Sequence, residues 1–233
     1  MRCVWEHNGD DTLLYSADYI GAFTRGENLE IATRKMQDEI TSYLMWQDES
    51  FVDDFKVEIV QEKKSDLQIA DADSDVIFED EEKPLTLEEY MELKKLVLKS
   101  AEDFYRLYEF IPDKEKSCLS ERKTFYGAVP RTAKEMYEHT KNVNAYYFAE
   151  IKVEADNEDT IFECRKRGFE ILEKQEDFLK NEVVEGSYGE YWSLRKVMRR
   201  FLWHDRIHAK AMYKMAVKTF GKENIKNVFK FII

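Results

Sequence analysis

Two histidines one helical turn apart are the residues of this chain whose spacing most directly indicates chemistry. His204 and His208 belong to the sequence WHDRIH, inside an amphipathic stretch of residues 193–221. Imidazoles at positions i and i+4 of a helix lie on one face, close enough for one ring nitrogen of each to bind the same metal ion. Both fall on the stripe predicted to face the core, which consists of Val197, Phe201, His204, His208, Ala211 and Met215.

A third histidine, His139, lies at a core-facing position of another predicted helix. An isolated inward histidine is more often a hydrogen-bonded core residue than a ligand, and a single pair four residues apart is a weak signal. Three buried imidazoles without a metal would each need separate hydrogen-bond partners. The sequence therefore predicts a metal site formed by His139, His204 and His208. The remaining histidine, His7, is expected in an exposed polar loop.

This ligand set limits the metal and indicates a type of reaction. Neutral imidazoles suit Zn²⁺, Ni²⁺, Fe²⁺ or Cu²⁺, and the sequence does not select one of them. Three protein ligands leave coordination positions open, where the pKa of a bound water could fall from about 15.7 to about 7, or a thiol could bind as thiolate. Acid–base candidates are Glu135, one turn before His139, and Glu150, further along the same helix. The simpler interpretation makes Glu135 a helix-capping residue and Glu150 a solvated side chain.

Other catalytic classes do not fit the spacing. The residues three positions before the histidines are Met136, Phe201 and Asp205, so the Glu-x-x-His pairs of di-iron proteins are absent. The chain contains no HExxH, no GxSxG and no Gly-rich phosphate-binding loop. Cys164 could be a reactive thiol, but a small buried residue is the simpler interpretation.

Four amphipathic helices are predicted to position the histidines. The first begins after Thr86, with Glu89 completing a capping box, and the second begins after Thr132, with Glu135 in the same role. The third spans roughly residues 159–181 and the fourth residues 193–221. None of these helices could bury its apolar face alone, so the sequence predicts an all-α four-helix bundle over residues 85–221. Residues 222–233 are expected as a C-terminal tail.

The first 62 residues are predicted to form an α+β domain. Residues 13–15, residues 21–23 and the alternating residues 55, 57 and 59 indicate short strands. A helix with an apolar stripe is expected to begin after Asn28. Residues 63–84 are dominated by charge and are predicted to be an acidic linker between the two domains.

Charge is distributed unevenly along the chain. Residues 1–90 carry 24 acidic and 8 basic side chains, a net −16, whereas the remainder carries 24 and 28, a net +4. An acidic surface repels phosphate backbones, which disfavours nucleic-acid binding. No apolar run approaches the roughly 20 residues of a membrane span. Three cysteines without CxxC spacing fit reduced thiols, so a cytoplasmic location is expected.

The segment 85–221 resembles the DinB-like superfamily of four-helix bundles, which includes metal-dependent thiol transferases that use bacillithiol or mycothiol. The resemblance rests on TAKEMYEH, which ends at His139, and on WHDRIH, which ends at His208. In that family these positions supply a three-histidine metal site. The resemblance therefore implies metal binding by His139, His204 and His208, and it implies no particular substrate.

Residues 1–62 look like the N-terminal domain of HicB-type antitoxins, a small strand-strand-helix-strand unit. The matching part is GAFTRGENLEIATRKMQDEITSYL, residues 21–44. Relatives typically add a small DNA-binding domain, which is not predicted here. The resemblance therefore implies the fold more firmly than a repressor's role.

Two functions remain as hypotheses. In the first, the metal activates water or a thiol for transfer to a small electrophile, as in a metal-dependent transferase or hydrolase. In the second, the chain is a non-enzymatic interaction protein whose acidic N-terminal domain binds a protein partner while the bundle is structural. The sequence leaves the oligomeric state open, including a homodimer.

Overall fold

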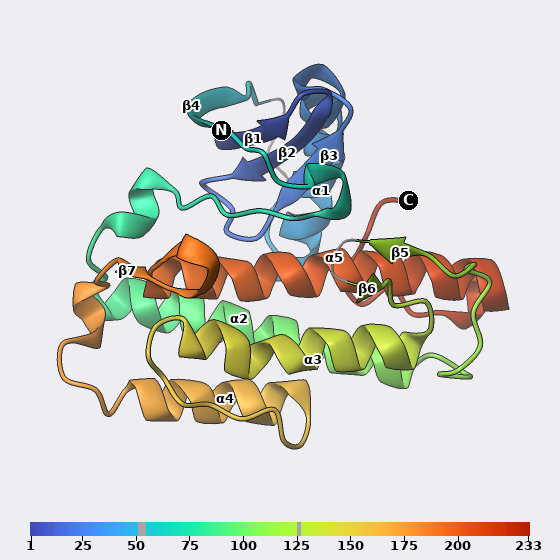
Figure 1. Ribbon diagram of the computed structural model, residues 1–233. Coiled ribbons are helices and arrows are strands. Elements are labelled where there is room, and N and C mark those ends of the chain that lie inside the picture. The colour runs from blue at the N-terminus through green and yellow to red at the C-terminus, as the bar shows by residue number, and fades with distance from the viewer. Residues whose placement is uncertain (51–54, 125–126) are drawn as a thin grey trace.

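The N-terminal part of the chain is a mixed sheet with one helix packed against it. The computed structural model describes residues 1–50, 55–124 and 127–233. Strands β1 (Arg2–Asn8), β2 (Asp11–Ser16) and β3 (Phe23–Gly26) are antiparallel neighbours, and β4 (Glu58–Lys64) pairs in parallel with β1. Helix α1 (Leu29–Gln47) connects β3 to β4 and makes the parallel pairing possible. The resulting strand order is β3-β2-β1-β4 (Figure 1).

Several local predictions for this part are confirmed. The strand expected over residues 13–15 is β2, and Asn28 caps α1 by accepting a hydrogen bond from the Ile31 backbone N–H. Gly21 and Ala22 lie outside β3, which begins at Phe23. The sequence interpretation did not identify β1 as a strand.

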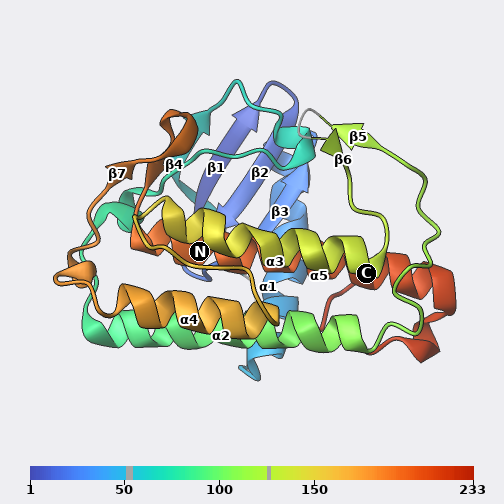
Figure 2. The same cartoon turned by 60° about the horizontal axis from the view of Figure 1, so that its bottom comes forward.

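Four further helices form the second half of the chain. They are α2 (Leu87–Glu109), α3 (Ala133–Ala149), α4 (Ile161–Leu172) and α5 (Leu194–Phe220). Helices α2 and α3 each pack against both α4 and α5, and the four run side by side (Figures 1 and 2). The predicted capping boxes at Thr86 and Thr132 are both formed. Short strands β5 (Lys123–Thr124) and β6 (Gly127–Ala128) precede α3, and β7 (Val184–Glu185) and β8 (Tyr191–Trp192) precede α5.

Helix α4 is shorter than the predicted span of residues 159–181. Thr160 caps it, and it ends at Leu172 with Glu173 as its C-terminal cap. The following residues, 173–177, are all polar or charged and offer no apolar stripe that could be buried. Asp177 then adopts a left-handed conformation, with φ 63°, before the short turn Phe178–Lys180.

The segment expected as an acidic linker, residues 63–84, is packed against the rest of the molecule. It contains the end of β4 and two short 3₁₀ turns, Ile69–Asp71 and Glu79–Glu82. Its apolar side chains Ile69, Val76 and Phe78 are buried and form a small core with Trp203 of α5. These apolar residues, together with the ion pair between Glu81 and Arg199 of α5, hold the charged segment against the helices.

The sheet and the helices share one hydrophobic core. Residues of the N-terminal part, such as Cys3, Leu14 and Met36, belong to the same buried cluster as residues of α2, α3 and α5. The C-terminal tail contributes Phe229, whose ring stacks on Trp46 of α1 at 5.2 Å between centroids. Within the described ranges, no helix has both the length and the apolar character needed to cross a bilayer.

Candidate metal centre

The structure brings together the three histidines that the sequence singled out. His139 lies on α3, and His204 and His208 lie one turn apart on α5. The ring centroids are separated by 5.2 Å for His139 and His204, 4.6 Å for His139 and His208, and 4.4 Å for His204 and His208. One ring nitrogen of each can be chosen so that all three lie within 4.8 Å of one another. This group could hold a metal ion.

N-terminal caps determine where the two helices that carry the triad begin. Ser193 caps α5 by accepting a hydrogen bond from the Lys196 N–H, and Thr132 caps α3 by accepting one from the Glu135 N–H. The aromatic side chain of Tyr147, on α3, contacts the His204 ring edge-on, with 6.1 Å between centroids. The relative position of the imidazoles therefore follows from the packing of α3 against α5.

Burial keeps all three imidazoles neutral. His204 is 9% exposed, and His139 and His208 are partly buried. Burial lowers the pKa of His139, and it lowers the pKa of His208 to about 3, with a further contribution from His139. The pKa of His204 is lowered by burial first and then by its two histidine neighbours. Neutral imidazoles have the free lone pairs that metal binding requires.

No hydrogen bond reaches any of the three imidazoles within the part of the chain that the structure describes. The Nδ1 atom of His204 is buried and has no partner. Buried polar groups in folded proteins are nearly always hydrogen-bonded, and an exception needs an explanation. The alternative of three ordinary hydrogen-bonded core histidines is therefore not what the structure shows. A metal ion would satisfy one nitrogen of each ring.

The two acid–base candidates, Glu135 and Glu150, do not belong to this group. Glu135 Oε2 accepts hydrogen bonds from the backbone N–H groups of Arg131 and Thr132, at 2.7 and 3.1 Å, and these bonds lower its pKa. Glu150 is the C-terminal cap of α3 and is only 6% exposed, so the expectation of a solvated side chain is wrong. Its Oε2 atom accepts a hydrogen bond from the Ser187 N–H at 2.7 Å, whereas its Oε1 atom is buried without a hydrogen-bond partner.

His7 and Cys164 are two further residues for which the sequence predicts an environment. His7 does not lie in an exposed loop: it is part of β1, stacked on Trp5 with 4.0 Å between centroids. Its Nε2 atom lies 3.0 Å from a carboxylate oxygen of Glu62 on β4. Cys164 is fully buried in α4, as expected for a small core residue, and burial raises its pKa.

Buried charges on α5 were not identified from the sequence. Arg165 of α4 and Asp205 are both fully buried and form two hydrogen bonds, at 2.6 and 3.1 Å. Two further arginines of α5 pair with distant carboxylates, Arg199 with Glu81 and Arg206 with Glu39. The sequence contains a signal for this burial, because apolar residues occur around most of the circumference of α5 and such a helix is expected to be buried on all sides.

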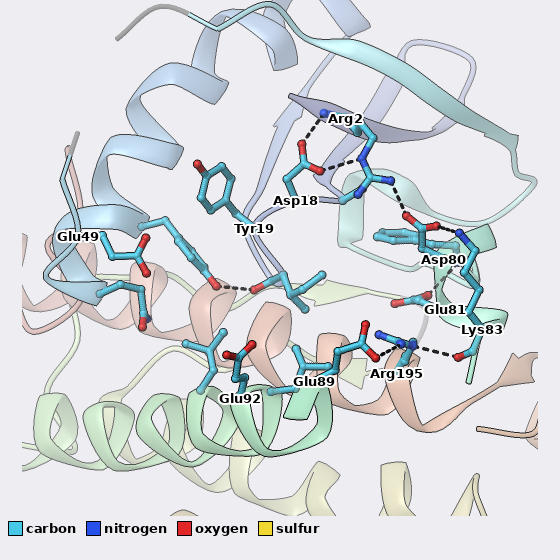
Figure 3. Close-up of a pocket in the computed structure, with 17 residues that line it drawn as sticks. Arg2, Asp18, Tyr19, Glu49, Asp80, Glu81, Lys83, Glu89, Glu92 and Arg195 are labelled. Atoms are coloured by element: carbon cyan, nitrogen blue, oxygen red, sulfur yellow. Dashed lines mark hydrogen bonds and ion pairs between the residues drawn. The ribbon is translucent and has the colours of Figure 1, made fainter. Parts of the chain in front are cut away.

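A cavity of about 730 Å³ lies between the N-terminal sheet and α2 (Figure 3). Its acidic side chains are mostly ion-paired: Asp18 and Asp80 contact Arg2, and Glu89 contacts Arg195. None of the three histidines lines this cavity, so it is separate from the candidate metal centre.

Searches with the sequence and the structure identify no relative. No family model, no curated protein and no solved structure matches the chain.

Proposed function

We propose that this chain is a metalloprotein of the DinB-like four-helix type, in which a divalent ion held by His139, His204 and His208 activates water or a thiol for transfer to a small electrophile. The observation that carries the proposal is the convergence of three neutral imidazoles, one buried and two partly buried, that lack hydrogen bonds. The packing of α2 and α3 against α4 and α5 supports the bundle class. The order of strands and helix in residues 1–64 agrees with a HicB-like unit that has one additional strand.

The geometry requires a small adjustment on metal binding. Tetrahedral coordination at a metal–nitrogen distance of about 2.1 Å places ligand nitrogens roughly 3.4 Å apart. The nitrogens of the triad all lie within 4.8 Å of one another, so a pair at that separation would have to approach by about 1.4 Å.

The described residues would hold the ion and leave part of its coordination sphere free. A bound divalent ion supplies a Lewis acid there, which lowers the pKa of a coordinated water or thiol. His139 and His208 are only partly buried, so the triad remains accessible from solvent. No carboxylate of the described residues belongs to the group, and the nucleophile's proton would therefore pass to solvent or buffer.

Metal loading tests this function directly. Protein loaded with Zn²⁺, Ni²⁺ or Fe²⁺ is mixed with small thiols and electrophiles, and thiol consumption is compared with that of metal-free protein and of His139→Ala. We expect faster consumption with at least one metal and no acceleration by the variant. Full metal loading without any conversion would remove the catalytic part of the proposal.

Chelation distinguishes a catalytic metal from a structural one. Removal of an ion from an open catalytic site should abolish activity with a modest loss of stability. A purely structural ion would instead lower the melting temperature strongly on removal, without any activity to lose. That second result would favour a non-enzymatic interaction protein, in which the acidic N-terminal part contacts a partner.

A further inference from the structure

Arg200 of α5 is a buried cation that no carboxylate of the described residues pairs with. It is 9% exposed, and its Nη1 atom donates one hydrogen bond, to the Ser74 carbonyl at 2.9 Å. Its Nε–H is buried without an acceptor. Burying a charge is costly unless the charge is paired and hydrogen-bonded. The other buried cations on α4 and α5 each have a carboxylate partner, in the pairs Arg165–Asp205, Arg199–Glu81, Arg206–Glu39 and Lys196–Glu190. Each of these three paired arginines also has one buried N–H group without an acceptor, so the missing carboxylate is what distinguishes Arg200.

Two unsatisfied indole N–H groups lie on the rings that surround this guanidinium. Trp192 and Trp203 are 0% and 2% exposed, and the Nε1 atom of each is buried without a partner. The central guanidinium carbon of Arg200 lies 5.5 Å from the Trp192 ring centroid and 4.8 Å from that of Trp203. One cluster of side chains thus contains a positive charge and three N–H donors without acceptors. An oxyanion supplies what such a cluster lacks, because its oxygens are acceptors and carry negative charge.

The cluster lies next to the candidate metal centre. Arg200 precedes His204 by one helical turn on α5. The Tyr147 ring packs near both residues, with its centroid 5.6 Å from the guanidinium carbon and 6.1 Å from the His204 ring centroid. A small molecule bound at Arg200 could therefore extend to an ion held by the histidines.

We propose that Arg200, Trp192 and Trp203 bind the oxyanion of a small molecule, a carboxylate or a phosphate, whose other end reaches the metal at the histidine triad. The second half of this statement rests on the proposed metal site, whereas the anion site rests on the unpaired donors alone. The carboxylates of Glu6, Asp73 and Glu190 act on Arg200 through their charge without forming an ion pair with it.

Calorimetric titration of the full-length protein tests the anion site. Sodium acetate and inorganic phosphate are titrated separately, at constant ionic strength, into metal-free and zinc-loaded protein. We expect Arg200→Met to weaken binding of the better anion at least ten-fold. Trp203→Phe, which keeps most of the ring and removes the N–H, should cause a smaller loss. The control is Lys214→Met, which removes an exposed charge of the same helix and should leave binding unchanged.

The outcomes separate this inference from the proposed metal site. The inference is overturned if neither anion binds the wild-type protein, or if Arg200→Met and wild type bind equally well. Metal content is measured on the same samples. If the protein binds the anion but holds no zinc after loading, the result contradicts the metal site and supports the anion site. If Arg200→Met fails to fold, as judged by circular dichroism, Arg200→Lys and Trp203→Phe provide the comparison. Unchanged affinity in both of these would then count against the site.

Discussion

The buried pair of Arg165 and Asp205 should be strongly coupled in a double-mutant cycle. Both residues are 0% exposed, and they join α4 to α5 beside His204. Burial raises the pKa of Asp205 while Arg165 opposes that shift, so each charge depends on the other. Removing one partner of a buried pair typically costs about 3–5 kcal/mol, because the remaining charge is left uncompensated. For a chain of this length, that corresponds to a melting temperature lower by roughly 6–20 °C.

The cycle compares Arg165→Met, Asp205→Leu and the double variant by urea unfolding. We expect each single variant to be strongly destabilised and the double variant to recover to within about 1 kcal/mol of wild type, because hydrophobic replacements of buried pairs are often neutral. The exposed pair of Arg34 and Glu30 is the control and should show almost no coupling. Additive losses at Arg165 and Asp205 would refute this reasoning, since they would mean that neither charge depends on its partner.

Three further predictions concern single residues. Gly21→Ala should lower the free energy of unfolding by more than about 2 kcal/mol, because Gly21 has φ +90° and an added Cβ would lie 2.5 Å from the Leu202 Cβ. An unchanged midpoint of chemical unfolding would contradict this close contact. Glu135→Ala should cost about 0.5–2 kcal/mol through loss of the cap and leave metal content unchanged, whereas lost metal would show a role at the site. Burial raises the pKa of the Glu6 carboxyl group above 4.5. The contribution of this group to the free energy of unfolding is therefore present below pH 4.5, and it is lost as the pH rises through the pKa of Glu6 in the folded protein. We therefore expect the free energy of unfolding of Glu6→Gln, minus that of wild type, to increase between pH 4.5 and pH 7.5. A difference that stays constant over this range would argue against a raised pKa of Glu6.

The sequence predicted the histidine triad because the signal is local. Helical periodicity places His204 and His208 on the stripe that faces the core, and it does the same for His139 on α3. Capping residues predict where these helices begin, since a cap depends on residues three positions apart. The contact between α3 and α5 could also be predicted, because each helix has an apolar stripe and the two stripes can be buried against each other.

The partners of the buried charges could not be predicted by the same reasoning. Arg199 and Arg206 pair with residues more than 100 positions away, and no local spacing indicates such partners. They are buried because α5 contacts the N-terminal part as well as the other helices, so no side of it is fully exposed to solvent. Residues 63–84 illustrate the same limit, because their charge indicates solvation while Val76 and Phe78 hold them against α5.

Metal content of purified protein tests the central claim most directly. Wild type, His208→Ala and His7→Ala are purified without added metal, incubated with equimolar Zn²⁺, dialysed and subjected to elemental analysis. His7→Ala is the matched control, because it removes a histidine that lies on β1, outside the triad. We predict close to one zinc per chain in wild type and in His7→Ala, and far less in His208→Ala. Equal zinc in all three proteins would show that the triad is not the metal site.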